Sequence, residues 1–354
     1  MFDLESHLID LLSIPAIPGN DVQLFNFLAE RWRPWVDEIK SSRLGSLHAL
    51  RRGSGKEPRK RMMITAHMDG VGMMVSGLEG AFIYIVGVGG LDARILPGQW
   101  VTVHGREDIP GVIVDPGDRL LPEDTAGKTT PIKHLLIDTG LAADHLSRMV
   151  RVGDGISFSK SPQSMAGGWV MGHTLDNRAS LAAISACLER LQESTPVWDV
   201  WFVATVQEET THAGAKTSGF ELQPDLAVVL DTTFGASNGN SEPMMYPLDA
   251  GPALGIGPNV HPSLHRLFRS LAEELAIPYQ IEVLPGNSMT DAHTLQVVSA
   301  GIPCMVVSIP ILNMHTPVEV AALRDIQRAG ELTAGWVSRL GSAIHDPFEA
   351  ERTK

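Results

Sequence analysis

Histidines and carboxylates of this chain stand where apolar runs end, at the points where buried strands of a sheet would terminate. The carboxyl ends of the strands in an open α/β sheet are where sites are built, so we expect these side chains to converge. Imidazole and carboxylate groups together are the ligands of hydrolytic zinc and related metal sites. The set comprises His67 and Asp69 after Met62–Ala66, Glu208 and Glu209 after Trp198–Val206, Asp231 after Leu226–Leu230, His315 after Met305–Ile309, and Asp176 ahead of a helix.

The spacing of these residues indicates separate tasks. Residues two apart at a strand end point the same way, so the carboxylate of Asp69 can accept the second ring N–H of His67 and orient that ring as a metal ligand. Glu208 and Glu209 can both turn inward in a loop, one to bind metal and the other to hold a proton. A two-metal site also needs a carboxylate that bridges ions about 3.5–4 Å apart, and a loop residue such as Asp176 suits that task. Since unpaired charges in apolar surroundings are costly, the pattern favours a metallohydrolase over a chance set of surface groups.

Two patterns of apolar residues alternate along the chain and would position these groups. Residues 1–75 and 166–354 combine short apolar runs with helical periodicity, which predicts an α/β domain with a mostly parallel sheet covered by helices. Residues 76–165 hold closely spaced β-type runs separated by Gly and Pro, which predicts an inserted small β-barrel or sandwich. The predicted helices are Ala142–Val150 in the insertion, and Ala179–Gln192, His261–Ala276, Ala292–Ser299 and Val320–Leu340 outside it.

The composition is that of an acidic globular protein. Of its 354 residues, 44% are hydrophobic, and 28 Lys and Arg stand against 41 Asp and Glu, for a net charge of −13. Nucleic acids and anionic membranes need a concentrated basic patch, so we expect neither as a partner. No uninterrupted apolar stretch reaches about 18 residues, and the N-terminus lacks the features of a signal peptide, so we expect a cytoplasmic protein. The two cysteines, Cys187 and Cys304, fall in predicted core elements and should be free.

A series of short motifs extends in order over most of the chain. The motifs are Ala66-His67-Met68-Asp69, Leu175-Asp176-Asn177-Arg178, Val206-Gln207-Glu208-Glu209 with Gly214-Ala215, Leu230-Asp231, Thr290-Asp291-Ala292, and Ser308-Ile309-Pro310 followed by His315-Thr316-Pro317-Val318-Glu319. Together they resemble the glutamyl/deblocking aminopeptidase family, whose members form tetrahedral TET particles and include relatives labelled endoglucanase or cellulase. Each motif alone is weak, whereas the ordered set is specific.

The resemblance implies a dinuclear metallo-aminopeptidase that hydrolyses the N-terminal peptide bond of short peptides with a free N-terminus. It implies two divalent metal ions per subunit, zinc first, with cobalt or manganese as alternatives. Glu208 would be the general base and acid, and Asp69 the partner that orients His67. The inserted β domain would pair subunits into a homo-oligomer, a dodecamer first and a dimer second. The implied ligands share Asp176 as the bridge, with His67 and Asp231 on one ion and Glu209 and His315 on the other.

Other hydrolases have to be weighed against this interpretation. A metal-dependent carboxypeptidase or an N-acyl amino-acid deacylase would use a similar site but bind a substrate carboxylate with arginines, and only Arg178 stands next to a ligand in the sequence. A glycosidase would need two carboxylates around a sugar and no metal. Gly70, Asn177 and Thr210-Thr211-His212 depart from the family pattern without removing a ligand. These departures leave the preferred N-terminal residue open.

Overall fold

The computed structural model describes residues 2–117, 121, 127–237, 244–344 and 347–348, and within them a 12-stranded sheet forms the centre of the larger domain. Its strands are β1 (Glu38–Ser41), β2 (Leu47–Arg51), β3 (Arg61–His67), β10 (Gln163–Met165), β11 (Trp169–Gly172), β12 (Asp199–Thr205), β13 (Leu226–Ala236), β14 (Tyr246–Pro247), β15 (Ala253–Ile256), β16 (Gln280–Val283), β17 (Cys304–Leu312) and β18 (Glu319–Ala322). The central strands, in the order β12-β3-β13-β17, pair in parallel. The flanking pairs β1–β2, β2–β12, β17–β18, β18–β11 and β11–β10 are antiparallel, so the sheet as a whole is mixed.

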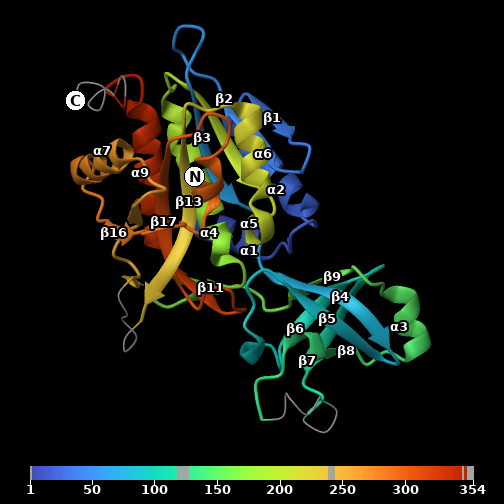
Figure 1. Ribbon diagram of the computed structural model, residues 1–354. Helices are drawn as coiled ribbons and strands as arrows, with labels where there is room; N and C mark the ends of the chain where they lie inside the picture. Colours follow the sequence, from blue (N-terminus) through green and yellow to red (C-terminus); the bar gives the residue numbers. More distant parts are fainter. Residues whose placement is uncertain (1, 118–120, 122–126, 238–243, 345–346, 349–354) are drawn as a thin grey trace.

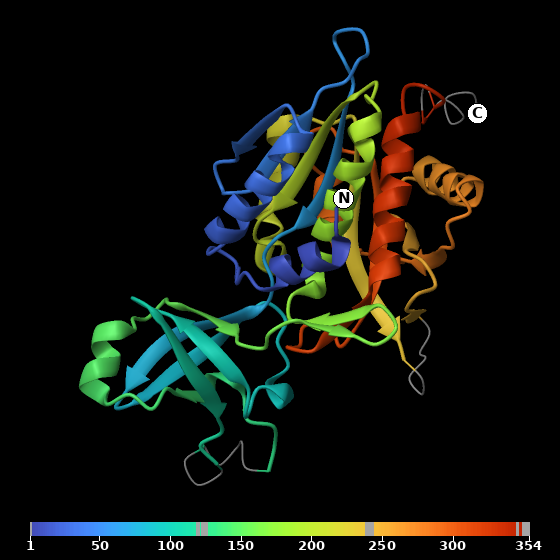
Figure 2. The ribbon, with the colours of Figure 1, turned by 180° about the vertical axis from the view of Figure 1, so that it is seen from behind.

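Helices cover both faces of this sheet, which confirms the predicted α/β class. Figure 2 shows α1 (Leu4–Leu12), α2 (Val22–Trp32), α4 (Leu175–Arg190) and α9 (Leu323–Arg339) on one face. The other face carries α5 (Glu208–Thr211), α6 (Ala213–Leu222) and α8 (Asp291–Leu295) (Figure 1). Of these helices, α6 packs against β12. Among the described helices of this domain, α7 (Pro262–Glu274) packs against β15 and α9.

Small residues explain why α4 is buried almost completely. This helix lies between the sheet and α9, and its central residues Ala182 and Ala183 are fully buried. On α9, a Cβ at Gly330 would lie 2.6 Å from the carbonyl oxygen of Ala183, so only glycine permits this close approach of the two helices. The packing holds the N-terminal end of α4, which carries Asp176, firmly against the sheet.

The inserted segment is a closed β-barrel with its own hydrophobic core, as the sequence predicted. In the described chain the barrel is closed by six strands in the order β4-β5-β8-β7-β6-β9, and α3 (Ala143–Met149) lies beside them. Alternate residues such as Val101 and Val103 are fully buried inside it, which is the period expected of strands that face a core on one side. Figures 1 and 2 show the barrel at one end of the large sheet. Its strands are β4 (Gly72–Glu79), β5 (Phe82–Val88), β6 (Trp100–His104), β7 (Asp108–Val114), β8 (Leu136–Asp138) and β9 (Gly155–Phe158).

Strand pairing gives the junctions of the two parts. β4 already belongs to the barrel from Gly72 onwards, whereas β10 pairs with β11 in the large sheet. These pairings do not test whether the two domains meet at residues 76 and 165, so these boundaries stay a prediction.

Among the described residues, no helix combines the length and the apolar character that crossing a membrane requires.

Three predicted helices differ in extent from those of the structure, and the one predicted over Ala179–Gln192 begins four residues earlier, as α4 at Leu175. Val320–Ala322, expected to begin the closing helix, belongs to β18, and all four residues of that strand are buried between β17 and β11. Hydrogen bonding to both neighbours therefore outweighs the local helical pattern. The helix expected over Ala292–Ser299 ends at Leu295, and Ser299 has a φ of 54°, which a helix cannot continue through.

Candidate active site

The structure brings all the predicted site residues together at the edge of the sheet where β3 and β12 end, beside β17 and β13, and β13 continues to Ala236 instead of ending at Leu230 as predicted. His67 ends β3, Asp231 lies within β13, and His315 follows β17, while Glu208 and Glu209 open α5 directly after β12. They form part of the wall of a pocket of about 800 Å³, together with Asp176. The side chain of Asp69 is fully buried behind this wall. Figure 1 shows β13 running towards this end of the sheet.

Asp176 lies between the two imidazoles. Its Oδ1 is 3.3 Å from Nε2 of His67, and its Oδ2 is 3.3 Å from Nε2 of His315. Asp176 and Asn177 lie within the first turn of α4 but have non-helical dihedral angles, with φ −82° and ψ 99° at Asp176. This local break lets the carboxylate present one oxygen to each histidine, which is the arrangement that a bridging ligand requires.

The remaining carboxylates fall into two groups around this centre. Oδ1 of Asp231 is 3.6 Å from Nε2 of His67. Oε2 of Glu209 is 3.5 Å from Nε2 of His315. Oε2 of Glu208 lies 3.8 Å from Nε2 of His67, so Glu208 sits beside the first group.

Backbone carbonyl groups orient both imidazole rings. Nδ1 of His67 is 2.9 Å from the carbonyl oxygen of Asp69, and Nδ1 of His315 is 3.0 Å from that of Gly90. A carbonyl oxygen only accepts hydrogen bonds, so Nδ1 of each ring carries a proton and donates it. In the neutral ring this leaves Nε2 with the lone pair that would bind a metal.

The carboxylate of Asp69 has a different partner from the one that spacing predicted. It was expected to accept the ring N–H of His67, but its nearer oxygen is 4.0 Å from that nitrogen. Its two oxygens instead accept the backbone N–H groups of Glu208 at 3.1 Å and Glu209 at 3.2 Å. Because β12 ends beside β3, the side chain of Asp69 reaches the turn after β12 and fixes the backbone of the glutamate pair.

Three supporting residues received no role from the sequence. The buried carboxylate of Glu319 accepts the backbone N–H groups of Asp176 at 3.2 Å and His315 at 2.7 Å. The side-chain amide of Asn177 donates to Oδ1 of Asp231 at 3.0 Å. Gly90, from the insertion, approaches so closely that a Cβ there would lie 3.0 Å from Nδ1 of His315. Glu319 and Asn177 stand within the quoted motifs, which was the one available signal, whereas nothing singled out Gly90.

His212 forms a charged contact with the predicted base. Its Nδ1 lies 3.0 Å from Oε1 of Glu208 and 3.5 Å from Oδ1 of Asp291. The carboxylates of Asp291 and Glu208 raise the pKa of His212 to about 10. Asp291 also accepts a hydrogen bond from Oγ1 of Thr205 at 2.6 Å. His212, which departs from the family pattern in the sequence, therefore lies in the wall of the pocket.

Burial and mutual repulsion perturb the titration of the site. Burial raises the pKa of Asp231 to about 7, and burial together with the charge of Asp176 raises the pKa of Glu209 well above its usual range. Burial alone would lower the pKa of His67, but the carboxylates of Glu208, Asp176 and Asp231 more than offset it and raise that pKa well above its usual value. The cluster therefore holds more carboxylates than its imidazoles can balance, and bound cations would remove this excess of negative charge.

The donor set fits divalent metal ions. Oδ1 of Asp176 and Oε1 of Glu209 are buried and have no hydrogen-bond partner in the described part of the chain. Ligand atoms of His67, Asp176 and Glu209 all lie within 4.8 Å of one another. Imidazole nitrogen and carboxylate oxygen suit zinc and related ions, so these residues could hold metal at this position.

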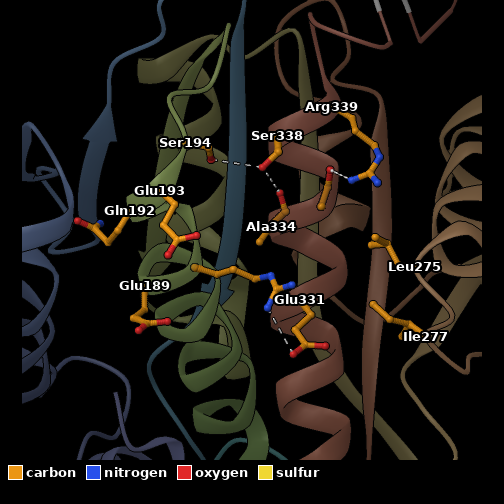
Figure 3. A pocket seen from close by; sticks show the side chains of 12 residues that line it. Glu189, Gln192, Glu193, Ser194, Leu275, Ile277, Glu331, Ala334, Ser338 and Arg339 are labelled. Atoms are coloured by element: carbon orange, nitrogen blue, oxygen red, sulfur yellow. Dashed lines mark hydrogen bonds and ion pairs between the residues drawn. The ribbon is translucent and has the colours of Figure 1, made fainter. Parts of the chain in front are cut away.

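A second pocket, of about 650 Å³, lies between the C-terminal ends of α4 and α9 (Figure 3). Its arginines have carboxylate partners, with Arg190 3.7 Å from Glu331 and Arg339 2.6 Å from Glu274. None of the residues that line it belongs to the site described above. The pocket at the carboxyl ends of the strands is therefore the one where catalysis is to be sought.

Comparison with known proteins gives the class of the chain. Residues 45–332 match the M42 glutamyl aminopeptidase family. A lysyl aminopeptidase of Pyrococcus furiosus is 29% identical over 338 residues, which cover 93% of this chain and 95% of that protein. An aminopeptidase structure from Desulfurococcus kamchatkensis has a TM-score of 0.87 at 30% identity and covers 95% of each chain. The TET1 peptidase of Pyrococcus horikoshii has a TM-score of 0.82 at 26% identity and covers 96% of this chain and 100% of that one.

The match defines a hydrolase that acts on peptide bonds, of the aminopeptidase class. This chain belongs to the M42 glutamyl aminopeptidase family. The resemblance inferred from the ordered motifs is thereby confirmed.

Proposed function

We propose that this chain is a dinuclear metal-dependent aminopeptidase that removes single residues from the free N-termini of short peptides. The observation that carries the proposal is the position of Asp176, whose two oxygens each face a different imidazole at 3.3 Å. A single carboxylate shared in this way suits a pair of ions, and Glu208 stands beside it as a base. Family membership supplies the aminopeptidase reaction.

The site residues divide into two ligand groups in this proposal. Asp176 would bridge, His67 and Asp231 would complete one group, and Glu209 and His315 the other. Zinc is the first expectation, with cobalt or manganese as alternatives. Bound ions would supply Lewis acidity, which lowers the pKa of water and polarises a peptide carbonyl.

The protein's own part in the reaction is proton transfer and orientation. Glu208 would take a proton from the attacking water and then deliver it to the leaving amine. Its carboxylate is held by His212 at 3.0 Å, and its backbone N–H by Asp69 at 3.1 Å. These two contacts fix the base relative to His67 before substrate binds, so little reorganisation is needed during the reaction.

The carboxypeptidase and deacylase alternatives would need an arginine or lysine in the pocket to bind the carboxylate of the substrate. The described residues that line the pocket include no Lys or Arg to bind a substrate carboxylate. Arg178, the arginine next to a ligand in the sequence, is fully buried, and its Nη1 donates to the carbonyl oxygen of Leu11. It therefore does not serve this pocket.

The direction of cleavage tests the proposal. Peptides with a free N-terminus should be shortened stepwise from that end, because the free amine is expected to bind beside the metal centre. N-acetylated copies of the same peptides should resist. Mass spectrometry of timed digests distinguishes the alternatives, since ladders that shorten from the C-terminus would favour a carboxypeptidase and contradict the proposal.

A homo-oligomer is the expected working form, a dodecamer first and a dimer second. The TET1 relative is described as able to assemble into a tetrahedron or a large octahedral shell. In this chain the barrel presents apolar side chains to solvent, with Trp100 66% and both Phe82 and Val86 40% exposed, which suits a surface that pairs subunits. Light scattering coupled to size exclusion should give a particle many times the 38.2 kDa chain mass. A fully active monomer at micromolar concentration would contradict this assembly and leave the metal chemistry in place.

A further inference from the structure

The pocket that contains the site has two chemically different walls. One wall carries the imidazoles and carboxylates described above. The other consists largely of apolar side chains from the end of β13, the segment after it, the end of β16 and the loop that follows, and the loop before His315. The apolar wall comprises Phe234, Met244, Val283, Leu284, Met289 and Met314.

Several of these apolar side chains are open to solvent. Met289 is 74% exposed, Phe234 58% and Met244 56%. Large apolar groups that stay hydrated inside a pocket gain free energy when an apolar ligand covers them, in proportion to the area removed from water. Methionine side chains are flexible and polarisable, so they adapt to apolar groups of different shape. The wall therefore fits a large apolar side chain.

The charges of the residues that line the pocket argue against a peptide whose N-terminal side chain is acidic or basic. No Lys or Arg is among the described residues that line the pocket. A carboxylate on the bound side chain would find no cationic side chain on this wall, and an unpaired buried carboxylate is costly. Glu282 is the one acidic lining residue outside the site in the described chain, but it is 7% exposed and accepts a hydrogen bond from Oγ of Ser308. A basic side chain would have to compete with that hydrogen bond.

The geometry points to a pocket that selects peptides whose N-terminal residue is large, apolar and uncharged, such as leucine, methionine or phenylalanine, and that rejects N-terminal glutamate. This inference rests on the proposed aminopeptidase function, which puts the N-terminal side chain of the substrate into this pocket. The names of the family and of the P. furiosus relative refer to charged residues, glutamyl and lysyl. The preference for an apolar N-terminal residue follows from the apolar side chains that line the pocket of this chain, and not from the names of its relatives.

A panel of aminoacyl-p-nitroanilides on the metal-loaded full chain tests the inference. The kcat/KM for the leucyl substrate should exceed that for the alanyl substrate by about 10- to 100-fold, because the larger side chain buries more apolar area. It should exceed that for the glutamyl substrate by at least about 100-fold. Glutamyl or lysyl substrates cleaved as fast as leucyl would overturn the inference and leave the aminopeptidase function standing. Failure to cleave any member of the panel would overturn the proposed function itself, and the inference with it.

Two substitutions of Met289 with opposite charges test directly whether the apolar wall contacts the N-terminal side chain of the substrate. Met289→Arg should raise the glutamyl-to-leucyl ratio of kcat/KM by about tenfold or more, and Met289→Glu should raise the lysyl-to-leucyl ratio similarly. Met165→Arg is the matched control, since Met165 is also exposed but lies on β10 outside the pocket, and it should leave both ratios unchanged. If both Met289 variants keep the wild-type ratios, the apolar wall does not contact the substrate side chain and the inference is wrong.

Discussion

Removal of bound divalent metal should abolish peptidase activity, and zinc or cobalt should restore it. Without cations, the carboxylates of Asp176, Glu209 and Asp231 lie within a few ångströms of two imidazoles, and buried oxygens of Asp176 and Glu209 have no hydrogen-bond partner in the described chain. Ions that bind this cluster only in the folded state also stabilise the fold by mass action, by about 2.7 kcal/mol when the free ion is at 100 times its Kd. The thermal midpoint should therefore fall together with activity.

The measurement combines chelation, elemental analysis and a thermal scan on the same sample. Reloading with each ion separately identifies which one restores activity. An Asp176→Asn variant should show reduced metal content and activity, whereas Asp138→Asn, on the barrel strand β8 and outside the pocket, should match the wild type. Full activity after elemental analysis has verified metal removal would rule out the proposed mechanism.

Glu208→Gln should lower kcat by about 10²- to 10⁴-fold, the usual contribution of a general base. The amide keeps the shape and the contact region near His212 but cannot accept the proton of the attacking water. Metal content should stay near the wild-type value, because Glu208 is not a ligand in the proposed site. Glu209→Gln should instead weaken metal binding at the group that contains His315.

Comparing kcat with metal content in the two variants decides the roles of the pair. Glu221→Gln is the control, since this exposed residue on α6 pairs with Lys40 outside the pocket. If Glu208→Gln lost metal while Glu209→Gln kept it and lost only kcat, the assignment of the two glutamates would be reversed. If both variants lost both kcat and bound metal, the two glutamates would share a structural role. This result would contradict the assignment of Glu208 as the base and Glu209 as a metal ligand.

The sequence determined which side chains meet and at which end of the sheet. Apolar runs such as Met62–Ala66 predict buried strands, and parallel strands bring their carboxyl ends to one edge. A residue at the end of such a run, such as His67, is therefore placed at that edge by its own strand. The barrel could also be predicted, because its strands follow one another closely with Gly and Pro between them and only one short helix, α3, interrupts them. The ordered motifs then specified the family.

Only the tertiary structure decided how these side chains are held. The ring of His315 is oriented by the carbonyl group of Gly90, which is 225 residues away in the chain and belongs to the barrel. The carboxylate of Asp69 turns to the backbone of the glutamate pair because β12 ends beside β3, a fact about strand neighbours that residue spacing does not contain. The same holds for Val320–Ala322, which form strand β18 because β17 and β11 lie on either side. Strand ends follow from local apolar patterns, whereas hydrogen-bond partners depend on loop conformations and on contacts between distant segments, which local patterns do not encode.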